Sequence, residues 1–197
     1  MSIAYKGLLV LICGPSGVGK GTVIRELKKD HPEYVYPLSC TTREIRPGEK
    51  KAEVYHFVSK EEFEKKLKNN EFLEYACVHK TEYYGTLKEM IIESLEAGKV
   101  VVRELDVQGF RSVRDKIPKE NLLSIFLKAP TKEDLVRRIL KRGRLSDDEM
   151  NRRMESAERE MAAIGEFDFQ VWSLEGRIPK CVGEVESIIN GRLKIMA

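Results

Sequence analysis

A run of apolar residues near the start of the chain leads directly into a glycine-rich loop and then into a helical pattern. The run, Leu8–Cys13, holds five aliphatic residues and a cysteine, which is typical of a strand buried on both faces of a parallel sheet. After the loop, Val23, Ile24 and Leu27 recur with the spacing of one helix face. This order of strand, loop and helix predicts a protein of the α/β class.

The loop between the strand and the helix has the spacing of a phosphate-binding loop, or P-loop. Gly14, Gly19 and Lys20 reproduce the frame G-x-x-x-x-G-K. Glycines let backbone N–H groups converge on an anion, the helix N-terminus adds partial positive charge, and the lysine can reach the terminal phosphates. We therefore expect the phosphates of a nucleotide to bind along the loop, which consists of Gly14, Pro15, Ser16, Gly17, Val18, Gly19, Lys20, Gly21 and Thr22.

The loop departs from the strict motif at the position that follows the lysine. Gly21 stands where Ser or Thr would place a hydroxyl on Mg²⁺, and Thr22 comes one residue later. Mg²⁺ commonly keeps several waters and takes its other ligands from substrate phosphates. We therefore predict no protein ligand for the metal and expect nucleotide phosphates and water to hold it.

The rest of the chain continues the alternation of strands and helices. Near-continuous apolar segments predict a parallel sheet with helices on both sides, a doubly wound α/β core. Three helix starts carry a Ser/Thr-x-x-acid capping pattern, at Ser59, Thr131 and Ser146. Further strands are predicted at residues 34–38, 54–58, 72–78, 100–105, 122–127 and 169–172.

The composition indicates one folded domain. Of its 197 residues, 42% are hydrophobic and 34% are charged. This apolar content is sufficient for a folded core, which excludes an intrinsically disordered chain. No apolar run approaches the roughly 20 residues of a membrane span. The 35 basic and 32 acidic residues leave a net charge of +3, too small a bias to predict a nucleic-acid or membrane partner.

The cysteines and histidines predict neither disulfides nor a zinc site. The four cysteines form no C-x-x-C pair, and the three histidines lack metal-ligand spacing. No N-terminal segment has the pattern of a signal peptide. We expect reduced thiols and a cytoplasmic location.

Two charged segments interrupt the α/β pattern and are interpreted as insertions into a single domain that spans residues 1–197. The first covers residues 39–84 and the second, which is dense in arginine, covers residues 131–163. The core then consists of residues 1–38, 85–130 and 164–197.

The first insertion carries an ordered set of residues that resembles the acceptor site of guanylate kinases. Residues 39–49 read Ser-Cys-Thr-Thr-Arg-Glu-Ile-Arg-Pro-Gly-Glu, and Tyr55, Glu74 and the segment 83–86, Tyr-Tyr-Gly-Thr, follow. The resemblance continues in order through residues 104–109, 129–131 and 138–143. It implies transfer of the γ-phosphoryl group of ATP to GMP, with Mg²⁺, in purine nucleotide metabolism, and indicates no obligate protein partner.

The residue types of this set suit a guanine nucleotide. Arg43 and Arg46 can hold one phosphate with forked donors, helped by the hydroxyls of Tyr55 and Tyr84. Glu74 can accept from guanine N1–H and the 2-amino group together, which adenine cannot offer. The resemblance assigns Ser39 and Thr86 to guanine O6. The predicted GMP-binding residues are Ser39, Arg43, Arg46, Glu49, Tyr55, Glu74, Tyr84, Thr86 and Asp106.

The second insertion is expected to act as a lid over the phosphates. Most of its arginines alternate with acidic residues, as on a solvated helix face. Arg138, Arg142 and Arg153 match lid arginines of the family, and a lid must close because an open site would let ATP hydrolyse. The predicted catalytic residues are Lys20, Arg43, Arg138, Arg142 and Arg153.

Four positions depart from the family pattern, among them Ala52, which stands where the acceptor loop usually has a glycine. Glu104 stands where Asp is usual, and Ser173 stands where an Asn is expected near the adenine of the donor. Arg103 lies inside an otherwise apolar strand, so it requires a carboxylate partner or a strand end.

Two alternative functions are weighed against an active kinase. One is an inactive, guanylate-kinase-like module that binds proteins, but such modules lack a working P-loop, whereas Lys20 is present. The other is a kinase of a different phosphorylated acceptor, and the base-reading set around Glu74 argues against it.

Overall fold

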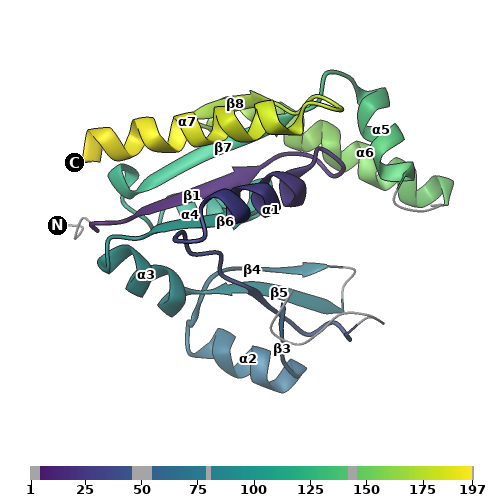
Figure 1. The fold of residues 1–197 in the computed structure, drawn as a ribbon. Coiled ribbons are helices and arrows are strands. Elements are labelled where there is room, and N and C mark those ends of the chain that lie inside the picture. Colours follow the sequence, from purple (N-terminus) through teal and green to yellow (C-terminus); the bar gives the residue numbers. More distant parts are fainter. Residues whose placement is uncertain (1–4, 46–54, 79–80, 142–145, 197) are drawn as a thin grey trace.

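A four-stranded parallel sheet forms the centre of the protein, seen here in a computed structural model that describes residues 5–45, 55–78, 81–141 and 146–196. Its strands are β1 (Leu8–Cys13), β6 (Val100–Glu104), β7 (Leu122–Lys128) and β8 (Phe169–Trp172), in the spatial order β6-β1-β7-β8 (Figure 1). All neighbouring pairs are parallel. The predicted α/β class with a parallel sheet is confirmed.

Strand β1 contributes alternate residues to two separate cores. Leu8, Val10 and Ile12 pack into the core on one face of the sheet. Leu9 and Leu11 pack into the core on the other face. Every residue of the strand is fully buried, as the continuous apolar run predicts for a central parallel strand.

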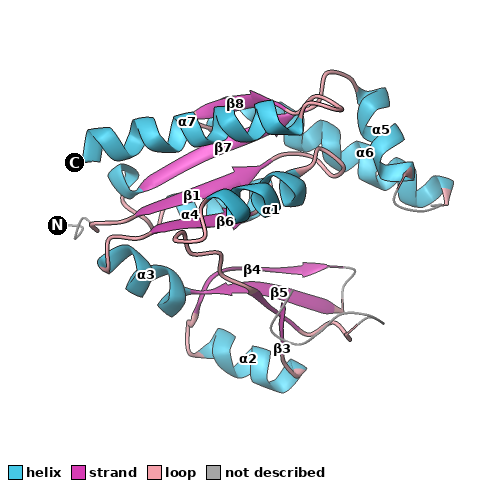
Figure 2. Ribbon diagram, in the orientation of Figure 1, coloured by secondary structure: helices cyan, strands magenta, loops and turns pink. Residues whose placement is uncertain are grey.

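Helices cover both faces of this sheet (Figure 2). On one face, α1 (Lys20–Asp30) and α7 (Ile178–Met196) contribute side chains to the core. On the other, α3 (Lys88–Glu96) and α4 (Val107–Arg114) do so. A short 3₁₀ turn at Lys119–Asn121 leads into β7, and a second at Ile164–Glu166 precedes β8.

A second, smaller sheet lies beside the first. It contains β2 (Ser39–Thr41), β3 (Tyr55–Phe57), β4 (Phe72–Val78) and β5 (Glu82–Leu87) in the order β3-β2-β5-β4. Helix α2 (Lys60–Lys68) packs on it through Phe63, whose ring stacks on Phe72 with centroids 4.3 Å apart. Ser59 begins α2 with a complete capping box, as its sequence pattern predicts.

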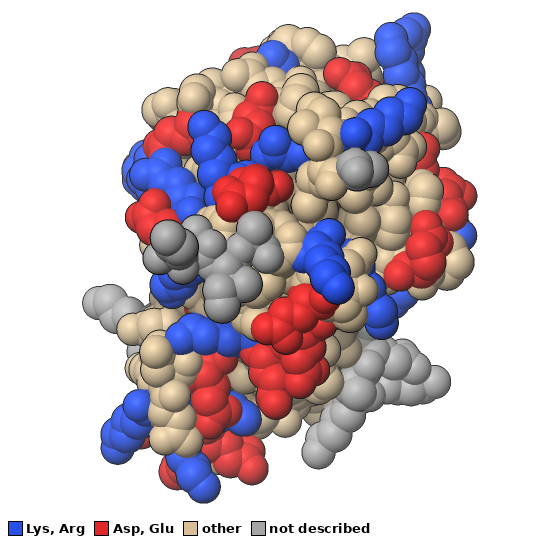
Figure 3. Space-filling model, turned by 90° about the vertical axis from the view of Figure 1, so that its left-hand side faces the viewer, with Lys and Arg blue, Asp and Glu red and all other residues tan. Residues whose placement is uncertain are grey.

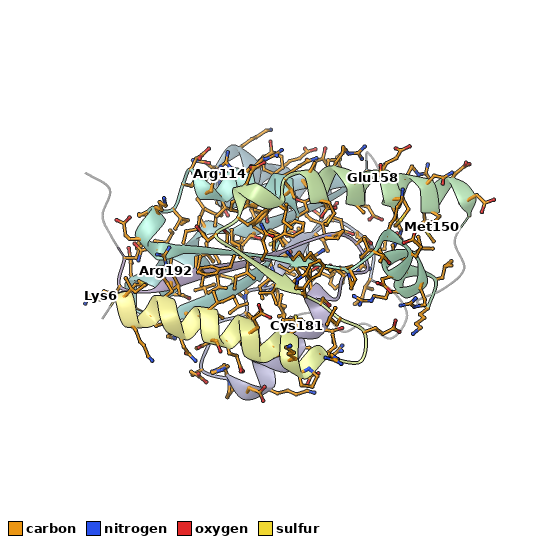
Figure 4. The ribbon with its side chains drawn as sticks, turned by 90° about the horizontal axis from the view of Figure 1, so that it is seen from above. Lys6, Arg114, Met150, Glu158, Cys181 and Arg192 are labelled. Carbon is orange, nitrogen blue, oxygen red and sulfur yellow. The ribbon has the colours of Figure 1, made fainter. Side chains whose placement is uncertain are left out.

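The arginine-rich segment forms two helices at the carboxyl ends of the parallel strands (Figure 1). They are α5 (Lys132–Leu140) and α6 (Asp147–Ala162), and the side chains of Thr131 and Ser146 cap them as predicted. Met150 and Glu158 of α6 lie at one end of the molecule, and Lys6 and Arg192 lie at the opposite end (Figure 4).

The strand predicted at residues 34–38 is wrong. Val35 makes one parallel bridge to Val101, with two backbone hydrogen bonds to β6. Pro37 follows two residues later and has no N–H to continue the ladder. The strands β2 and β5, conversely, were not predicted, because their residues are mostly polar or aromatic and half-buried.

Among the helices in the described part of the chain, none has the length and apolar character needed to cross a bilayer. On the face at the amino ends of the parallel strands, basic and acidic side chains are interspersed (Figure 3). All four cysteines are free thiols.

Candidate nucleotide-binding site

A cleft of about 1080 Å³ lies between the P-loop and the second sheet. The P-loop and α1 supply one wall, the strands β2 to β5 supply another, and the residues that end β6 lie between them. Predicted site residues on its walls are Pro15, Ser16, Gly17, Gly19, Lys20, Gly21, Ser39, Tyr55, Glu74, Tyr84 and Asp106. The cleft thus brings together residues predicted to hold the donor and residues predicted to hold the acceptor.

Left-handed backbone conformations shape the P-loop. Gly19 has a φ of 107° and stands at the N-cap of α1. Gly17 has a φ of 84°, and a Cβ there would lie 2.8 Å from the Cγ1 of Ile139 in α5. Only glycine combines this φ with so close an approach. The loop therefore packs directly against the arginine-rich segment.

Lys20 is folded onto its own loop. Its ammonium donates to the carbonyl oxygen of Gly14 at 2.5 Å and lies 3.9 Å from Oε1 of Glu104. The carbonyl bond holds the charge at the mouth of the anion-binding loop, where it can attract phosphate oxygens.

The acceptor wall centres on a buried carboxylate. Glu74 in β4 is only 8% exposed, and Thr86 of β5 donates its hydroxyl to Glu74 Oε1 at 2.5 Å. Burial raises the pKa of Glu74, while the Thr86 hydroxyl and the Arg103 guanidinium lower it. In this structure the Thr86 proton goes to Glu74, and Thr86 is not among the residues that line the cleft.

Two tyrosines stand on the same wall. The Tyr84 hydroxyl donates to Glu82 at 3.0 Å, and the Tyr84 and Tyr55 rings meet edge to face with centroids 5.7 Å apart. Burial and the Glu82 carboxylate raise the pKa of Tyr84, so this hydroxyl stays protonated near neutral pH and can donate.

Arg43 is held by aromatic rings and backbone. Its guanidinium lies 5.3 Å from the ring centroid of Tyr55 and 5.4 Å from that of Phe57, and it donates to the carbonyl of Glu44 at 2.7 Å. It is buried and is not among the residues that line the cleft. The other predicted contacts of this loop, Arg46 and Glu49, lie outside the described residues.

The predicted lid arginines are engaged with protein groups. Arg138 donates to the carbonyls of Val18 at 3.2 Å and Ser173 at 2.8 Å. Arg153 donates to Glu149 at 2.7 Å within α6. Arg142 lies outside the described residues. In this arrangement Arg138 holds the backbone of the P-loop through the carbonyl of Val18. Its predicted contact with phosphates requires the guanidinium to leave the carbonyls of Val18 and Ser173.

Asp106 and Ser173 both support local backbone. Asp106 caps α4 by accepting from the N–H of Gly109 at 2.7 Å. Ser173 is fully buried and donates to the carbonyl of Val18 at 2.6 Å. Ser173 thus fixes the P-loop, a role that its expected place near the adenine did not suggest.

Six of the described charged residues on the walls of the cleft were not predicted as site residues: Arg25, Lys28, Glu82, Arg103, Glu104 and Glu160. Arg103 is the penultimate residue of β6 and donates to Ser39 of the second sheet. Glu160 comes from α6, and its buried Oε2 accepts no hydrogen bond within the described part of the chain. In the sequence, Arg103 could be noticed because it interrupts an apolar strand. Glu160 could not, because basic and acidic residues alternate along its helix.

Comparison with known proteins agrees with this geometry. The family profile described as guanylate kinase matches residues 6–191. A guanylate kinase of Clostridium tetani is 42% identical over 185 residues, covering 94% of this chain and 86% of the relative. One of Trichormus variabilis is 44% identical over 165 residues, covering 84% and 81%. The crystal structure of guanylate kinase from Anaplasma phagocytophilum superimposes with a TM-score of 0.74 at 25% identity, covering 97% of this chain and 88% of that one.

A parallel sheet whose first strand runs into a P-loop, with an acceptor wall opposite, defines the class of P-loop kinases that phosphorylate small acceptors. The match over most of the length then fixes the family. The chain belongs to the guanylate kinase family.

Proposed function

We propose that this protein transfers the γ-phosphoryl group of ATP to GMP, giving ADP and GDP. One observation carries the proposal: the P-loop with Lys20 and the buried carboxylate of Glu74 face the same cleft. A carboxylate can accept from guanine N1–H and the 2-amino group at once. Family membership and the relatives' names support the same activity.

The nucleophile in this reaction is a phosphate oxygen of GMP. The second pKa of a phosphate monoester lies near ~6, so the oxygen is already largely deprotonated at neutral pH. No general base is then required. The protein has instead to align two anions that repel each other and to place positive charge around the transferred group.

Different walls of the cleft are proposed to hold the donor and the acceptor. Lys20 and the P-loop amides hold the phosphates of the donor. Arg43 and Arg46, with the hydroxyls of Tyr55 and Tyr84, hold the acceptor phosphate. Arg138, Arg142 and Arg153 are proposed to add charge on closure, after Arg138 leaves Val18 and Arg153 leaves Glu149.

Mg²⁺ is proposed to enter with ATP. Mg²⁺ prefers oxygen ligands and keeps several waters, and when bound it would neutralise charge on the phosphates. The cleft also contains the carboxylates of Glu104 and Asp106, oxygen donors whose chemistry fits Mg²⁺ or the waters bound to it. No cluster of three metal-binding side chains occurs in the described ranges, and ligation by phosphate and water alone remains our prediction.

The cytoplasm, with its purine nucleotides, is the proposed location of the reaction. ATP and GMP are the proposed partners.

A coupled assay of ADP release tests the proposed function. ATP and Mg²⁺ are supplied with GMP, AMP, UMP or IMP, and we expect turnover with GMP to exceed that with each of the others. No ADP release with GMP would refute the proposal and favour a protein-binding module. Turnover confined to AMP or UMP would favour another acceptor.

A further inference from the structure

Arg103 connects the two sheets of the protein. Its backbone belongs to β6 of the central sheet, paired with Leu11 of β1. Its guanidinium donates to the carbonyl of Pro37 at 2.7 Å, to the hydroxyl of Thr86 at 3.0 Å and to the hydroxyl of Ser39. All three acceptors belong to the acceptor segment or its approach, so one side chain holds the hydroxyls predicted to face the base.

These bonds determine the direction in which each hydroxyl can donate. A hydroxyl has one proton and two lone pairs, and a guanidinium can only donate. Both hydroxyl oxygens therefore accept from Arg103. The Thr86 proton is used on Glu74. Among the described residues no acceptor takes the Ser39 proton, which therefore remains for a ligand, and Ser39 and Arg103 both line the cleft.

The same guanidinium also supports the charge on Glu74. Glu74 is buried, which raises its pKa and disfavours the carboxylate, and the positive charge of Arg103 opposes that effect. Thr86 lies between the two groups as a relay, because it accepts from Arg103 and donates to Glu74. Arg103 thus favours a wall with one hydroxyl donor, Ser39, and one carboxylate acceptor, Glu74.

We propose that Arg103 is a positioning residue that selects purines with a 6-oxo group by fixing the hydroxyl of Ser39 as a donor and keeping Glu74 as an acceptor. A carbonyl oxygen at C6 accepts from Ser39, whereas an amino group at C6 meets a second donor and a nearby positive charge. The inference rests on the proposed function and adds to it the residue that orients the base-reading groups.

The test compares two acceptors that differ at the 6-oxo edge. GMP carries the carbonyl, and 2,6-diaminopurine riboside 5′-monophosphate keeps the 2-amino group but carries an amino group at C6. In Arg103→Leu we expect kcat/KM for GMP to fall about tenfold to hundredfold, the usual range for loss of charged hydrogen bonds. The loss should lie mainly in KM, and the preference for GMP over the diaminopurine nucleotide should narrow. IMP, which keeps the carbonyl, should lose efficiency in step with GMP.

A second variant covers failure of Arg103→Leu to fold. Arg103→Lys keeps the charge beside Glu74 but cannot hold two hydroxyls with a planar fork, so we expect an intermediate loss of preference. Arg177→Leu, at an exposed arginine before α7, is the matched control and should keep both the preference and the KM of the wild type.

The outcomes separate the two proposals. A wild type that does not phosphorylate GMP overturns the proposed function and this inference together. An active wild type whose Arg103 variants keep the wild-type preference, or lose kcat equally with both nucleotides, overturns only the role of Arg103. A lower KM for GMP in the variants would show that Arg103 blocks the base pocket instead, and it too would overturn the inference.

Discussion

Glu74 and Thr86 are direct cross-strand partners in β4 and β5, and the Thr86 hydroxyl donates to the Glu74 carboxylate at 2.5 Å. The pairing fixes the carboxylate at a defined place on the wall of the cleft. Neighbouring strands hold both side chains, so their separation is set by the register of the sheet.

Replacing Glu74 by Gln should relax the preference for guanine. The amide retains one acceptor but replaces the other by a donor, which opposes guanine N1–H or the 2-amino group. We expect the ratio of kcat/KM for GMP to that for AMP to fall by about 10² or more. Glu71→Gln, which changes a half-buried carboxylate paired with Lys66, is the control. An unchanged ratio in Glu74→Gln would show that another group reads the base.

Removing the Thr86 hydroxyl should change the pH dependence of GMP use. Burial raises the pKa of Glu74, and the Thr86 bond, Arg103 and Lys116 lower it while Asp106 raises it. In Thr86→Val the pKa should therefore rise further. Protonated Glu74 cannot accept twice, so KM for GMP should increase as the pH falls through this pKa.

The readout is the displacement between two pH profiles. The phosphate of GMP titrates identically for wild type and Thr86→Val, so only a difference between their acid limbs reports on Glu74. We expect the limb of the variant to lie at higher pH. The raised pKa of Glu74 in the folded protein also affects stability: the free energy of unfolding should fall as the pH rises past the ordinary glutamate pKa near 4.3. If the acid limbs of the wild-type and Thr86→Val profiles coincide, the assigned effect of Thr86 on the pKa of Glu74 is contradicted.

Replacing Lys20 by Ala should abolish most turnover while sparing GMP binding. Lys20 belongs to the donor wall, and loss of one charge that stabilises a transition state typically costs about 10² to 10³ in kcat. Calorimetric titration with GMP should give an affinity close to that of the wild type. Lys29→Ala, an exposed lysine paired with Glu26 in the same helix, controls for the loss of a charge from α1. Unimpaired turnover in Lys20→Ala would remove the P-loop lysine from the mechanism.

Replacing Gly17 by Ala should destabilise the protein. The φ of 84° and the 2.8 Å approach to Ile139 both oppose a Cβ, and a strained backbone of this kind costs about 1 to 3 kcal/mol. Gly183 offers a control inside α7, where a Cβ meets no atom within 4 Å and Ala should stabilise by about 0.5 to 1 kcal/mol. Urea unfolding measures both free energies. A Gly17→Ala variant as stable as the wild type would show that the loop readily repacks.

Replacing Ser173 by Ala should weaken the P-loop. The change removes a buried donor to Val18 and an acceptor for Arg138, at an expected cost of about 1 to 3 kcal/mol in the free energy of unfolding. KM for ATP should rise with little change in KM for GMP. Ser187→Ala removes an exposed hydroxyl that donates to Gly183 within α7 and should leave both values unchanged. Equal effects of the two variants would contradict a specific role for Ser173.

The sequence predicted the central sheet and the P-loop because their signals are local. The apolar run of β1 and the spacing of Gly14, Gly19 and Lys20 are each contained in a few consecutive residues. Family resemblance then supplied the acceptor residues. The short strands β2 and β5 escaped prediction because they contain few aliphatic residues, so no apolar alternation marks them.

The role of Arg103 could not be read from the sequence, because it depends on contacts between distant segments. Ser39 is 64 positions away and Thr86 is 17 positions away. The apolar strand indicated that Arg103 needed a carboxylate partner or a strand end, and Arg103 does lie one residue before the end of β6. Its direct acceptors are a carbonyl and two hydroxyls, and Glu74 lies one hydrogen bond further on.

The alternation of β1 between two cores has a consequence for how the protein denatures. Helices α1 and α7 cannot separate from one face without exposing Leu8, Val10 and Ile12, and that exposure weakens the strand on which α3 and α4 rest. Both helical layers thus share one structural support. Cooperativity of this kind favours loss of the central sheet as a single unit, and it ties the integrity of the P-loop at the end of β1 to the global folding equilibrium.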